Sequence, residues 1–327
     1  MRPTPAITRA PRPRRGRTAQ WLRTFAILLV LLILGSAAVS AYVGWKLTHP
    51  EPKPLTDSPD KHGIPFEPVQ FASRNQDVTL KGWFLPASGV SDGSGGSGGS
   101  NAAKLNIIMA HGYRENRLQS GAEALKLAKE LTAHGYNVLM FDFRNSGESG
   151  GSLTTVGYLE QFDLLGAIDW TRTHHPGKIA LHGFSMGATA SLLAAAKDPE
   201  IAGVVADSPF NHLTHYLEQN LPVWSHLPNF PFTPLILGIL PPLTGIVTDQ
   251  VDGLSAVDLI YPRPVLFIHT ADDESIPLRN SESMWEKHAD RFQLWKAPAG
   301  QSHGKAHAVL PKEYETRVLE FYNSLHP

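Results

Sequence analysis

The sequence predicts an α/β fold: a mainly parallel eight-stranded sheet with helices on both faces, preceded by one transmembrane helix. Three observations predict it. From Leu105 onward, short apolar stretches alternate with longer helix-like ones, which is typical of a mainly parallel sheet covered by helices. A Gly-x-Ser-x-Gly sequence occupies residues 183–187, between one such strand and the next helix. Residues 24–45 carry no charge and are long enough to cross a bilayer.

Residues 24–45 form the predicted transmembrane helix. About 20 apolar residues cross the hydrocarbon core of a bilayer. Trp21, Tyr42 and Trp45 lie near the two ends, where amphipathic rings favour the interface. A cleaved signal peptide is the alternative interpretation, because residues 39–41 (Val-Ser-Ala) have the small side chains of a cleavage site. The apolar run is longer than the apolar core of a signal peptide, so we favour an uncleaved anchor.

The charges around this helix predict its orientation. Seven arginines precede it, and Lys46 is the one basic residue just after it. Because basic flanks stay in the cytoplasm, residues 1–23 are predicted to be a basic cytoplasmic tail and the catalytic domain to be extracytoplasmic. Residues 46–64 contain the sequence HPEPKP and are predicted to be an extended linker. Residues 65–327 form the predicted folded domain.

The elements of the folded domain follow from apolar runs bounded by turn residues. We predict strands at residues 68–72, 78–85, 105–110, 137–142, 178–181, 203–206, 264–269 and 293–296, and helices at 121–133, 157–173, 186–197, 281–289 and 311–325. The first two strands alternate in hydrophobicity, as in a hairpin at a sheet edge. Residues 88–100 are so rich in glycine and serine that we expect a flexible loop there.

Residues 210–260 interrupt the alternation of strands and helices. They contain apolar pieces punctuated by proline, such as FPFTPLILGILPPLTGIV. An insertion at the carboxyl edge of a parallel sheet would lie over a ligand site, so this segment is a candidate cap. Ordinary packing of helices against the sheet is the second interpretation, and the sequence does not separate the two.

Composition excludes several classes of function. The chain of 327 residues has no cysteine, which excludes disulfides, zinc–thiolate sites and a cysteine nucleophile. Eight of the 29 basic residues precede Glu51, where there is no acidic residue, so the rest carries 21 basic and 30 acidic side chains. An acidic domain repels phosphate backbones, so we expect no nucleic-acid partner. The histidines show no metal-ligand spacing, and neither a metal nor another cofactor is expected.

Ser185 is the predicted nucleophile. It stands in Gly183-Phe184-Ser185-Met186-Gly187, directly after a strand and directly before a helix. On so tight a turn, a Cβ at Gly183 or Gly187 would collide with neighbouring backbone. The hydroxyl is expected to point toward the N-terminus of the helix, which favours a developing anion. The pentapeptide alone is a weak signal, and its place between strand and helix makes it a strong one.

A serine nucleophile needs a base, and the base needs an orienting carboxylate. On this type of turn the serine is followed in the chain by the acid and then by the histidine, each just after a strand. The loop after the seventh predicted strand contains Asp272, Asp273 and Glu274. The loop after the eighth contains His303, with His307 nearby as a rival.

Several motifs resemble the α/β-hydrolase superfamily. They are HGYRENR at 111–117, FDFRNSGES at 141–149, GFSMG at 183–187, IHTADDESIP at 268–277 and the histidine near the C-terminus. The resemblance covers residues 66–325, and within the superfamily the chain is similar to the serine aminopeptidase-like or Bem46-like branch. It implies the α/β-hydrolase fold and a Ser–Asp–His triad.

The family pattern selects among the candidate side chains. In the family, the sequence IHG-x-x-D-x-x-VP carries the triad acid, and laid over residues 268–277 it selects Asp273. The histidine that the family places before the final helix is His303. Two residues depart from the pattern, because Thr270 and Ser302 stand where glycine is usual. Neither departure removes a catalytic atom.

The resemblance also implies an oxyanion hole. One donor is the backbone N–H of Met186, the residue after the nucleophile. The second is expected from the loop after the third strand, where the N–H of Tyr113 is the default donor and its phenol is a related option. The turn at residues 144–147 resembles a family motif that supports the site structurally.

These observations predict a membrane-anchored serine hydrolase that cleaves a carboxylic ester or thioester through an acyl-enzyme on Ser185. The expected partners are a small-molecule ester or acyl substrate and the membrane, and the apolar cap segment and the anchor favour a lipophilic substrate. A serine peptidase of the same fold is the second hypothesis, although the chain shows no N-terminal propeller and no acidic pair for a substrate amine. A catalytically silent binding domain displayed on the membrane is the third, and the intact triad argues against it.

Overall fold

The protein is described by a computed structural model over residues 15–88, 103–300 and 302–325. It contains an eight-stranded sheet with the strand order β1-β2-β4-β3-β5-β6-β7-β8. β2 runs antiparallel to both of its neighbours, and all other neighbouring strands are parallel. The predicted mainly parallel sheet is therefore confirmed. The predicted loop at 88–100, apart from its first residue, and the first 14 residues of the basic tail lie outside the described residues.

The strands are β1 (Glu67–Ala72), β2 (Thr79–Leu85), β3 (Leu105–Ala110), β4 (Tyr136–Phe141), β5 (Ile179–Phe184), β6 (Ile201–Asp207), β7 (Val265–Thr270) and β8 (Gln293–Ala297). The α-helices are α1 (Arg15–Thr48), α2 (Ala124–Ala133), α3 (Glu160–His174), α4 (Met186–Lys197), α5 (Leu213–Ser225), α6 (Asn229–Thr244), α7 (Gly253–Ile260), α8 (Arg279–Trp285), α9 (Ala306–Val309) and α10 (Pro311–Ser324). Short 3-10 helices are η1 (Pro59–His62), η2 (Ser120–Ala122), η3 (Thr248–Gln250) and η4 (Glu286–His288). Every strand and domain helix predicted from the sequence is present.

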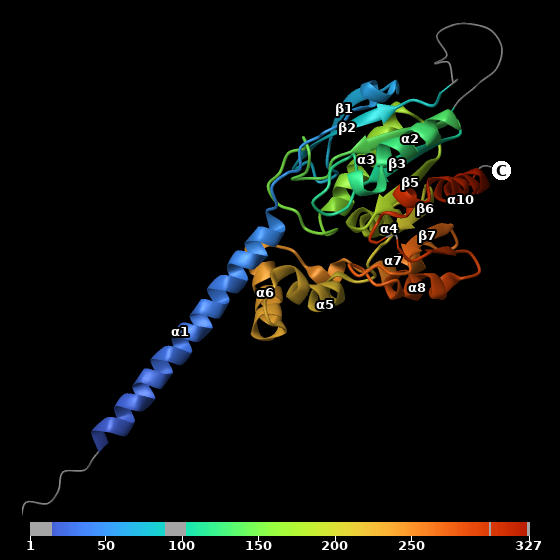
Figure 1. The fold of residues 1–327 in the computed structure, drawn as a ribbon. Coiled ribbons are helices and arrows are strands. Elements are labelled where there is room, and N and C mark those ends of the chain that lie inside the picture. Colours follow the sequence, from blue (N-terminus) through green and yellow to red (C-terminus); the bar gives the residue numbers. More distant parts are fainter. Residues whose placement is uncertain (1–14, 89–102, 301, 326–327) are drawn as a thin grey trace, which may run out of the picture.

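Helices cover both faces of the sheet (Figure 1). The core on one face joins strand side chains to α3, α4 and α7, and the core on the other face joins them to α2 and α10. Successive side chains of a strand point to opposite faces: in β3, Ile108 belongs to the first core, whereas Ile107 and Met109 belong to the second. Burial on both faces explains why this strand is apolar apart from Asn106 near its start.

α1 extends away from the sheet (Figure 1). It is long and apolar enough to cross a membrane, and its large side chains from Trp21 to Leu34 are exposed, unlike those of a core helix. The helix continues through Thr48, which is buried against the domain. It therefore takes up the first three residues of the predicted linker, because its last turn has the domain to pack against.

Residues 210–260 fold into α5, α6 and α7. α7 packs against α4 and belongs to the helical layer of the sheet, whereas α5 and α6 contact each other and α6 contacts α1. Phe210, Tyr216 and Trp224 line the cavity that contains Ser185. The beginning of this segment thus lines the cavity, and its last helix packs in the helical layer of the sheet. Whether the segment acts as a cap stays a prediction.

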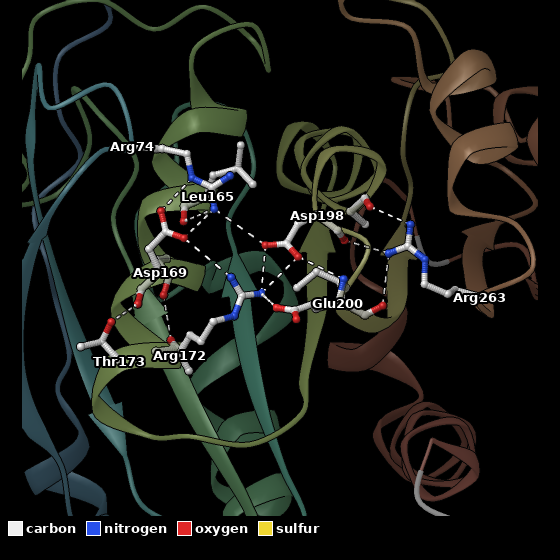
Figure 2. Close-up of polar contacts among 12 residues, drawn as sticks. Arg74, Leu165, Asp169, Arg172, Thr173, Asp198, Glu200 and Arg263 are labelled. Atoms are coloured by element: carbon white, nitrogen blue, oxygen red, sulfur yellow. Dashed lines mark hydrogen bonds and ion pairs between the residues drawn. The ribbon is translucent and has the colours of Figure 1, made fainter.

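An ion network ties the scaffold together at the amino ends of β6 and β7 (Figure 2). Arg172 of α3 donates to both carboxylate oxygens of Asp198, at 3.1 and 3.0 Å, and Arg74 lies 3.7 Å from the same carboxylate. Arg263 donates to backbone carbonyls at the ends of α4 and α7, those of Ala195, Asp198, Leu259 and Ile260. These contacts lie at the edge opposite the ends of the strands that carry the candidate site.

Candidate active site

Ser185 lies in the sharp turn between β5 and α4. Its backbone has φ 54° and ψ −119°, a conformation that residues with a side chain rarely adopt. A Cβ on Gly183 would collide with the carbonyl oxygen of Gly187, and a Cβ on Gly187 would collide with that of Ala110. Only glycine therefore fits at both positions, as predicted. The N–H of Ser185 donates to the carbonyl of Asp207, which fixes the turn to β6.

The structure brings Ser185, His303 and Asp273 together at the carboxyl edge of the sheet. Nε2 of His303 lies 2.8 Å from Oγ of Ser185, and Nδ1 lies 2.6 Å from Oδ2 of Asp273. An ionised carboxylate only accepts hydrogen bonds, so Nδ1 carries the proton and Nε2 is left to accept one from the serine hydroxyl. The three side chains follow β5, β8 and β7, whose carboxyl ends meet at this edge.

The carboxylate of Asp273 is buried and held in place by its own loop. The N–H groups of Ser275 and Ile276 donate to Oδ1 at 2.9 and 2.8 Å, which leaves Oδ2 for His303. Burial acts to raise the pKa of Asp273, but interactions with His269 and His303 outweigh it and hold the pKa well below its usual value. Asp273 is therefore ionised at neutral pH.

The loops that carry the acid and the histidine are joined directly. Oγ1 of Thr270 donates to the carbonyl of Ser302 at 3.1 Å, and the N–H of Gly300 donates to Asp272. Ser302 has φ 52°, a backbone conformation that favours glycine, which accounts for the family preference at this position. Asp272 and Glu274 are exposed. The role of Asp272 is to hold the histidine loop through its bond with Gly300.

His307, the rival base, does not approach Ser185. Its ring is buried, with Nδ1 2.7 Å from the carbonyl of Ala122 and Nε2 3.2 Å from Glu315. His307 thus joins η2 to α10, and His303 is the histidine that reaches Ser185.

The loop after β3 approaches Ser185 closely. A Cβ on Gly112 would lie 3.3 Å from Cβ of Ser185, and Tyr113 lines the same cavity as Ser185 and Met186. The phenol of Tyr113 donates to the carbonyl of Leu47 on α1 at 2.6 Å. The phenol therefore donates its proton to α1 and does not donate into an oxyanion hole, which was the second option for this side chain. Burial raises the pKa of Tyr113 to about 12, so the phenol stays a donor.

His111 fixes the start of this loop. Its Nδ1 donates to the carbonyl of Gly112 at 2.7 Å, and its Nε2 accepts from the N–H of Phe143 at 3.0 Å. Burial lowers the pKa of His111, so the ring stays neutral and can accept at Nε2. Arg144, in the turn expected to support the site, donates to Asp163 and does not line the cavity.

The cavity over Ser185 has a volume of about 350 Å³, a size that suits a small-molecule substrate. Apolar and aromatic side chains form most of its wall: Leu47, Tyr113, Val156, Met186, Phe210, Tyr216 and Trp224. Leu47 belongs to α1. No pattern in the sequence indicates that the end of α1 lines the site.

A buried polar chain behind Ser185 was also not apparent from the sequence. The hydroxyl of Tyr314 donates to Asp207 at 3.0 Å and accepts from Nε2 of His182 at 2.9 Å, and Nδ1 of His182 accepts from Tyr322 at 3.0 Å. Burial lowers the pKa of His182 to about 3, so the ring is neutral. Two tyrosines eight residues apart on the last helix were the one available signal. Within the described part of the chain, no cluster of three His, Asp or Glu side chains could hold a metal ion.

Comparisons with known proteins agree with this geometry. The model of the X-Pro dipeptidyl-peptidase (S15) family matches residues 103–232. YqkD of Bacillus subtilis is 34% identical over 223 residues, which cover 67% of this chain and 71% of YqkD. The esterase Pf2001 of Pyrococcus furiosus has a TM-score of 0.68 and 25% identity, over 86% of this chain and 99% of that one. The chain belongs to the α/β-hydrolase superfamily.

This α/β-hydrolase is also similar to the lysophosphatidylserine lipase ABHD12 of Xenopus tropicalis. The two are 25% identical over 227 residues, which cover 65% of this chain and 55% of the lipase. The resemblance stated from the sequence motifs is thereby confirmed, and the chain is a hydrolase by family. The S15 match contains Ser185 but ends before Asp273 and His303.

Proposed function

We propose that this hydrolase cleaves carboxylic esters or thioesters of small-molecule acyl substrates through an acyl-enzyme on Ser185. The hydrogen-bonded chain from Ser185 through His303 to Asp273 carries the proposal. Oγ of Ser185 attacks the acyl carbon while its proton passes to Nε2 of His303, and Asp273 stabilises the imidazolium. The imidazolium then protonates the leaving alcohol or thiol. Water, deprotonated by His303, releases the carboxylic acid and restores Ser185.

Two backbone N–H groups are proposed to hold the oxyanion. Met186 is the first residue of α4, where N–H groups have no partner inside the helix and the helix dipole favours negative charge. Tyr113 follows Gly112, which lies against Ser185. Donors aimed at the developing charge contribute on the order of a hundredfold to a thousandfold each to kcat.

The apolar cavity supports a lipophilic acyl group as the part of the substrate that binds beside Ser185. The similarity to an esterase and to a lysophosphatidylserine lipase supports ester chemistry over other hydrolyses. We propose further that α1 anchors the enzyme in a membrane, with residues 24–45 in the hydrocarbon core. Its exposed apolar side chains support this assignment, and the packing of its last turn against the domain supports an uncleaved helix.

A fluorophosphonate probe and a water-soluble p-nitrophenyl ester test the nucleophile. The full-length protein is expected to be labelled and to hydrolyse the ester, and Ser185→Ala is expected to lose both while it keeps its folded structure. Loss of a triad member lowers kcat by about a thousandfold or more. Replacement of a serine in the next turns of α4, Ser191→Ala, is the matched control. Hydrolysis by Ser185→Ala at more than about a thousandth of the wild-type rate would show that Ser185 is not the nucleophile.

A serine peptidase is the second candidate, favoured by the S15 family match. The comparison that separates the two is kcat/KM for an ester and for an anilide that carry the same acyl group. We expect the ester to be preferred by orders of magnitude. A larger kcat/KM for an X-Pro anilide would reverse the assignment in favour of the peptidase.

A further inference from the structure

α1 and α6 lie side by side (Figure 1). The contact is close, since a Cβ on Gly44 would lie 3.5 Å from Leu240 of α6. Ser40, one turn before Gly44, is buried, and Ser36 and Ala37 are half-buried. α6 therefore follows α1 from its last turns back to about Ser36.

This contact falls within the proposed membrane span. Ser36 lies nine residues before Trp45, which is about 14 Å along the helix at 1.5 Å per residue. The hydrocarbon core of a bilayer is about 30 Å thick. α6 therefore lies beside the half of the span that is nearest to the domain, at the depth of one leaflet.

The composition and surface of α6 suit hydrocarbon. The chain carries no charged residue from Leu227 to Thr248, a segment that contains all of α6. Phe230 and Leu243 are 82% and 58% exposed on the surface of the domain. Large apolar side chains that stay exposed next to a membrane span are characteristic of a surface that contacts lipid.

The charged side chains of this region lie near the end of α1. Thr248 lines a small cavity together with Thr48, the last residue of α1, and Asp249 follows directly. Oγ1 of Thr214 bonds both Thr248 and Asp249, and Glu218 lies one turn further along α5. Asp249 therefore lies near the level where α1 leaves the proposed span. Glu218 and Asp249 also line a cavity together with α6 residues from Asn229 to Pro241, so the face of α6 that would contact lipid is the one turned away from α5.

The cavity over Ser185 continues toward the interface of α1 and α6. It shares Leu47, Tyr113, Val156 and Trp224 with a second cavity of about 30 Å³. The further walls of this second cavity are mostly apolar: Leu213, Leu217, Leu221, Leu240 and Ile246. Because Leu47 belongs to α1 and Leu240 to α6, this second cavity lies between the two helices. It has room for about two water molecules, so an acyl chain that entered it from Ser185 would push the two helices apart.

We propose that α6 is embedded in the leaflet beside α1, and that the acyl chain of the substrate passes from that leaflet between α1 and α6 to Ser185. The substrate class is then an acyl ester or thioester lipid of the bilayer itself. This inference rests on the proposed function, because it places the anchor in the membrane and the reacting carbonyl at Ser185.

Fluorescence quenching by lipid tests whether α6 is embedded. The chain has no cysteine, so a single introduced thiol can be labelled without background. Phe230→Cys puts the thiol at the start of α6, and Leu259→Cys puts one on α7, where Leu259 is 67% exposed. The full-length variants carry an environment-sensitive fluorophore in phosphatidylcholine vesicles that contain doxyl-labelled lipid. We expect quenching several times stronger at position 230 than at position 259.

Equal quenching at the two positions, at the level of a water-exposed fluorophore, overturns the inference. A cooperative thermal unfolding transition at the wild-type temperature, followed by circular dichroism, first shows that both variants are folded. A protein that fails to hydrolyse any ester through Ser185 would refute the proposed function, yet the quenching at position 230 would still report whether α6 is embedded. The two failures are therefore distinguishable.

A change of chain-length preference tests the path. Leu240→Trp fills the space between α1 and α6, so the ratio of kcat/KM for a long-chain ester to that for an acetate ester is expected to fall at least tenfold. Leu259→Trp, on the exposed face of α7, is the matched control and keeps the wild-type ratio. Ile246→Phe is a milder filling variant in case Leu240→Trp does not fold. An unchanged ratio in a folded filling variant shows that the acyl chain does not use this path.

Discussion

At the scale of single residues, we expect the two histidines near the C-terminus to have different roles, catalytic for His303 and structural for His307. His303 reaches Ser185 and Asp273, whereas His307 bonds Ala122 and Glu315. His303→Ala is therefore expected to lower kcat for an ester by about a thousandfold or more, because no other base among the described residues bonds the hydroxyl of Ser185. Steady-state kinetics on the purified variant measures it.

His307→Ala is expected to act on stability instead. It leaves the buried carbonyl of Ala122 without a donor, which costs about 1–3 kcal/mol of unfolding free energy. Its kcat is expected to stay within a few fold of the wild type. If the two histidine variants showed the reverse pattern of kinetic effects, His307 would be the base.

Tyr113 offers a second test at this scale, because its phenol and its backbone N–H are expected to have different roles. The N–H is the proposed oxyanion donor. The phenol bonds the carbonyl of Leu47. Tyr113→Phe removes that bond and keeps the backbone, so we expect kcat to fall by less than about tenfold and the KM for a long-chain ester to rise. A phenol that held the oxyanion would show a loss of a hundredfold or more in kcat alone. Kinetics with acetate and long-chain esters separates the two.

At the scale of elements, strand periodicity and turn residues were enough to predict the sheet and the helices that cover it. Their physical basis is local, since apolar runs must be buried and glycine is required at positions such as Gly183 and Gly187. The triad followed for the same reason, because parallel strands carry the loops that follow them to a single edge. The division of residues 210–260 could not be predicted, since it depends on which neighbours α5, α6 and α7 find.

Polar contacts between distant elements were the other part that the sequence did not reveal. The chain from Asp207 through Tyr314 and His182 to Tyr322 joins β6, α10 and β5. An aspartate, a tyrosine or a histidine in a sequence does not by itself indicate which distant residue it will bond. Only the tertiary structure shows that they meet and that their buried groups satisfy one another.

The buried ring of His182, between β5 and α10, is expected to make the unfolding free energy of the protein depend on pH. Burial lowers the pKa of His182 to about 3, against about 6.5 in an unfolded chain. Between these values the unfolded state binds a proton that the folded state does not bind. The unfolding free energy is therefore expected to be highest above pH 6.5 and to fall as the pH is lowered toward 3. The protonation of His182 accounts for a fall of up to about 1.4 kcal/mol per pH unit.

The measurement is urea unfolding of the detergent-solubilised protein at several pH values. His182→Gln lacks the titrating group, so the difference in stability between wild type and variant is expected to shrink as the pH falls from 6.5. His174→Gln, at an exposed position, is the control and keeps the wild-type slope. Parallel curves for wild type and His182→Gln would show that the ring does not carry this dependence.

At the scale of the whole molecule, the expected topology places the hydrolase domain outside the cytoplasm. Seven arginines precede residues 24–45, only Lys46 directly follows them, and no acidic residue occurs before Glu51. Translocation of the arginines across the membrane is disfavoured, whereas the charge of a long domain has little effect on its translocation. Protease added to intact spheroplasts is therefore expected to digest the chain after Lys46 and to spare an epitope on the N-terminus. Protection of the domain until the membrane is broken would reverse the orientation, and a soluble product that begins near Tyr42 would show a cleaved signal peptide.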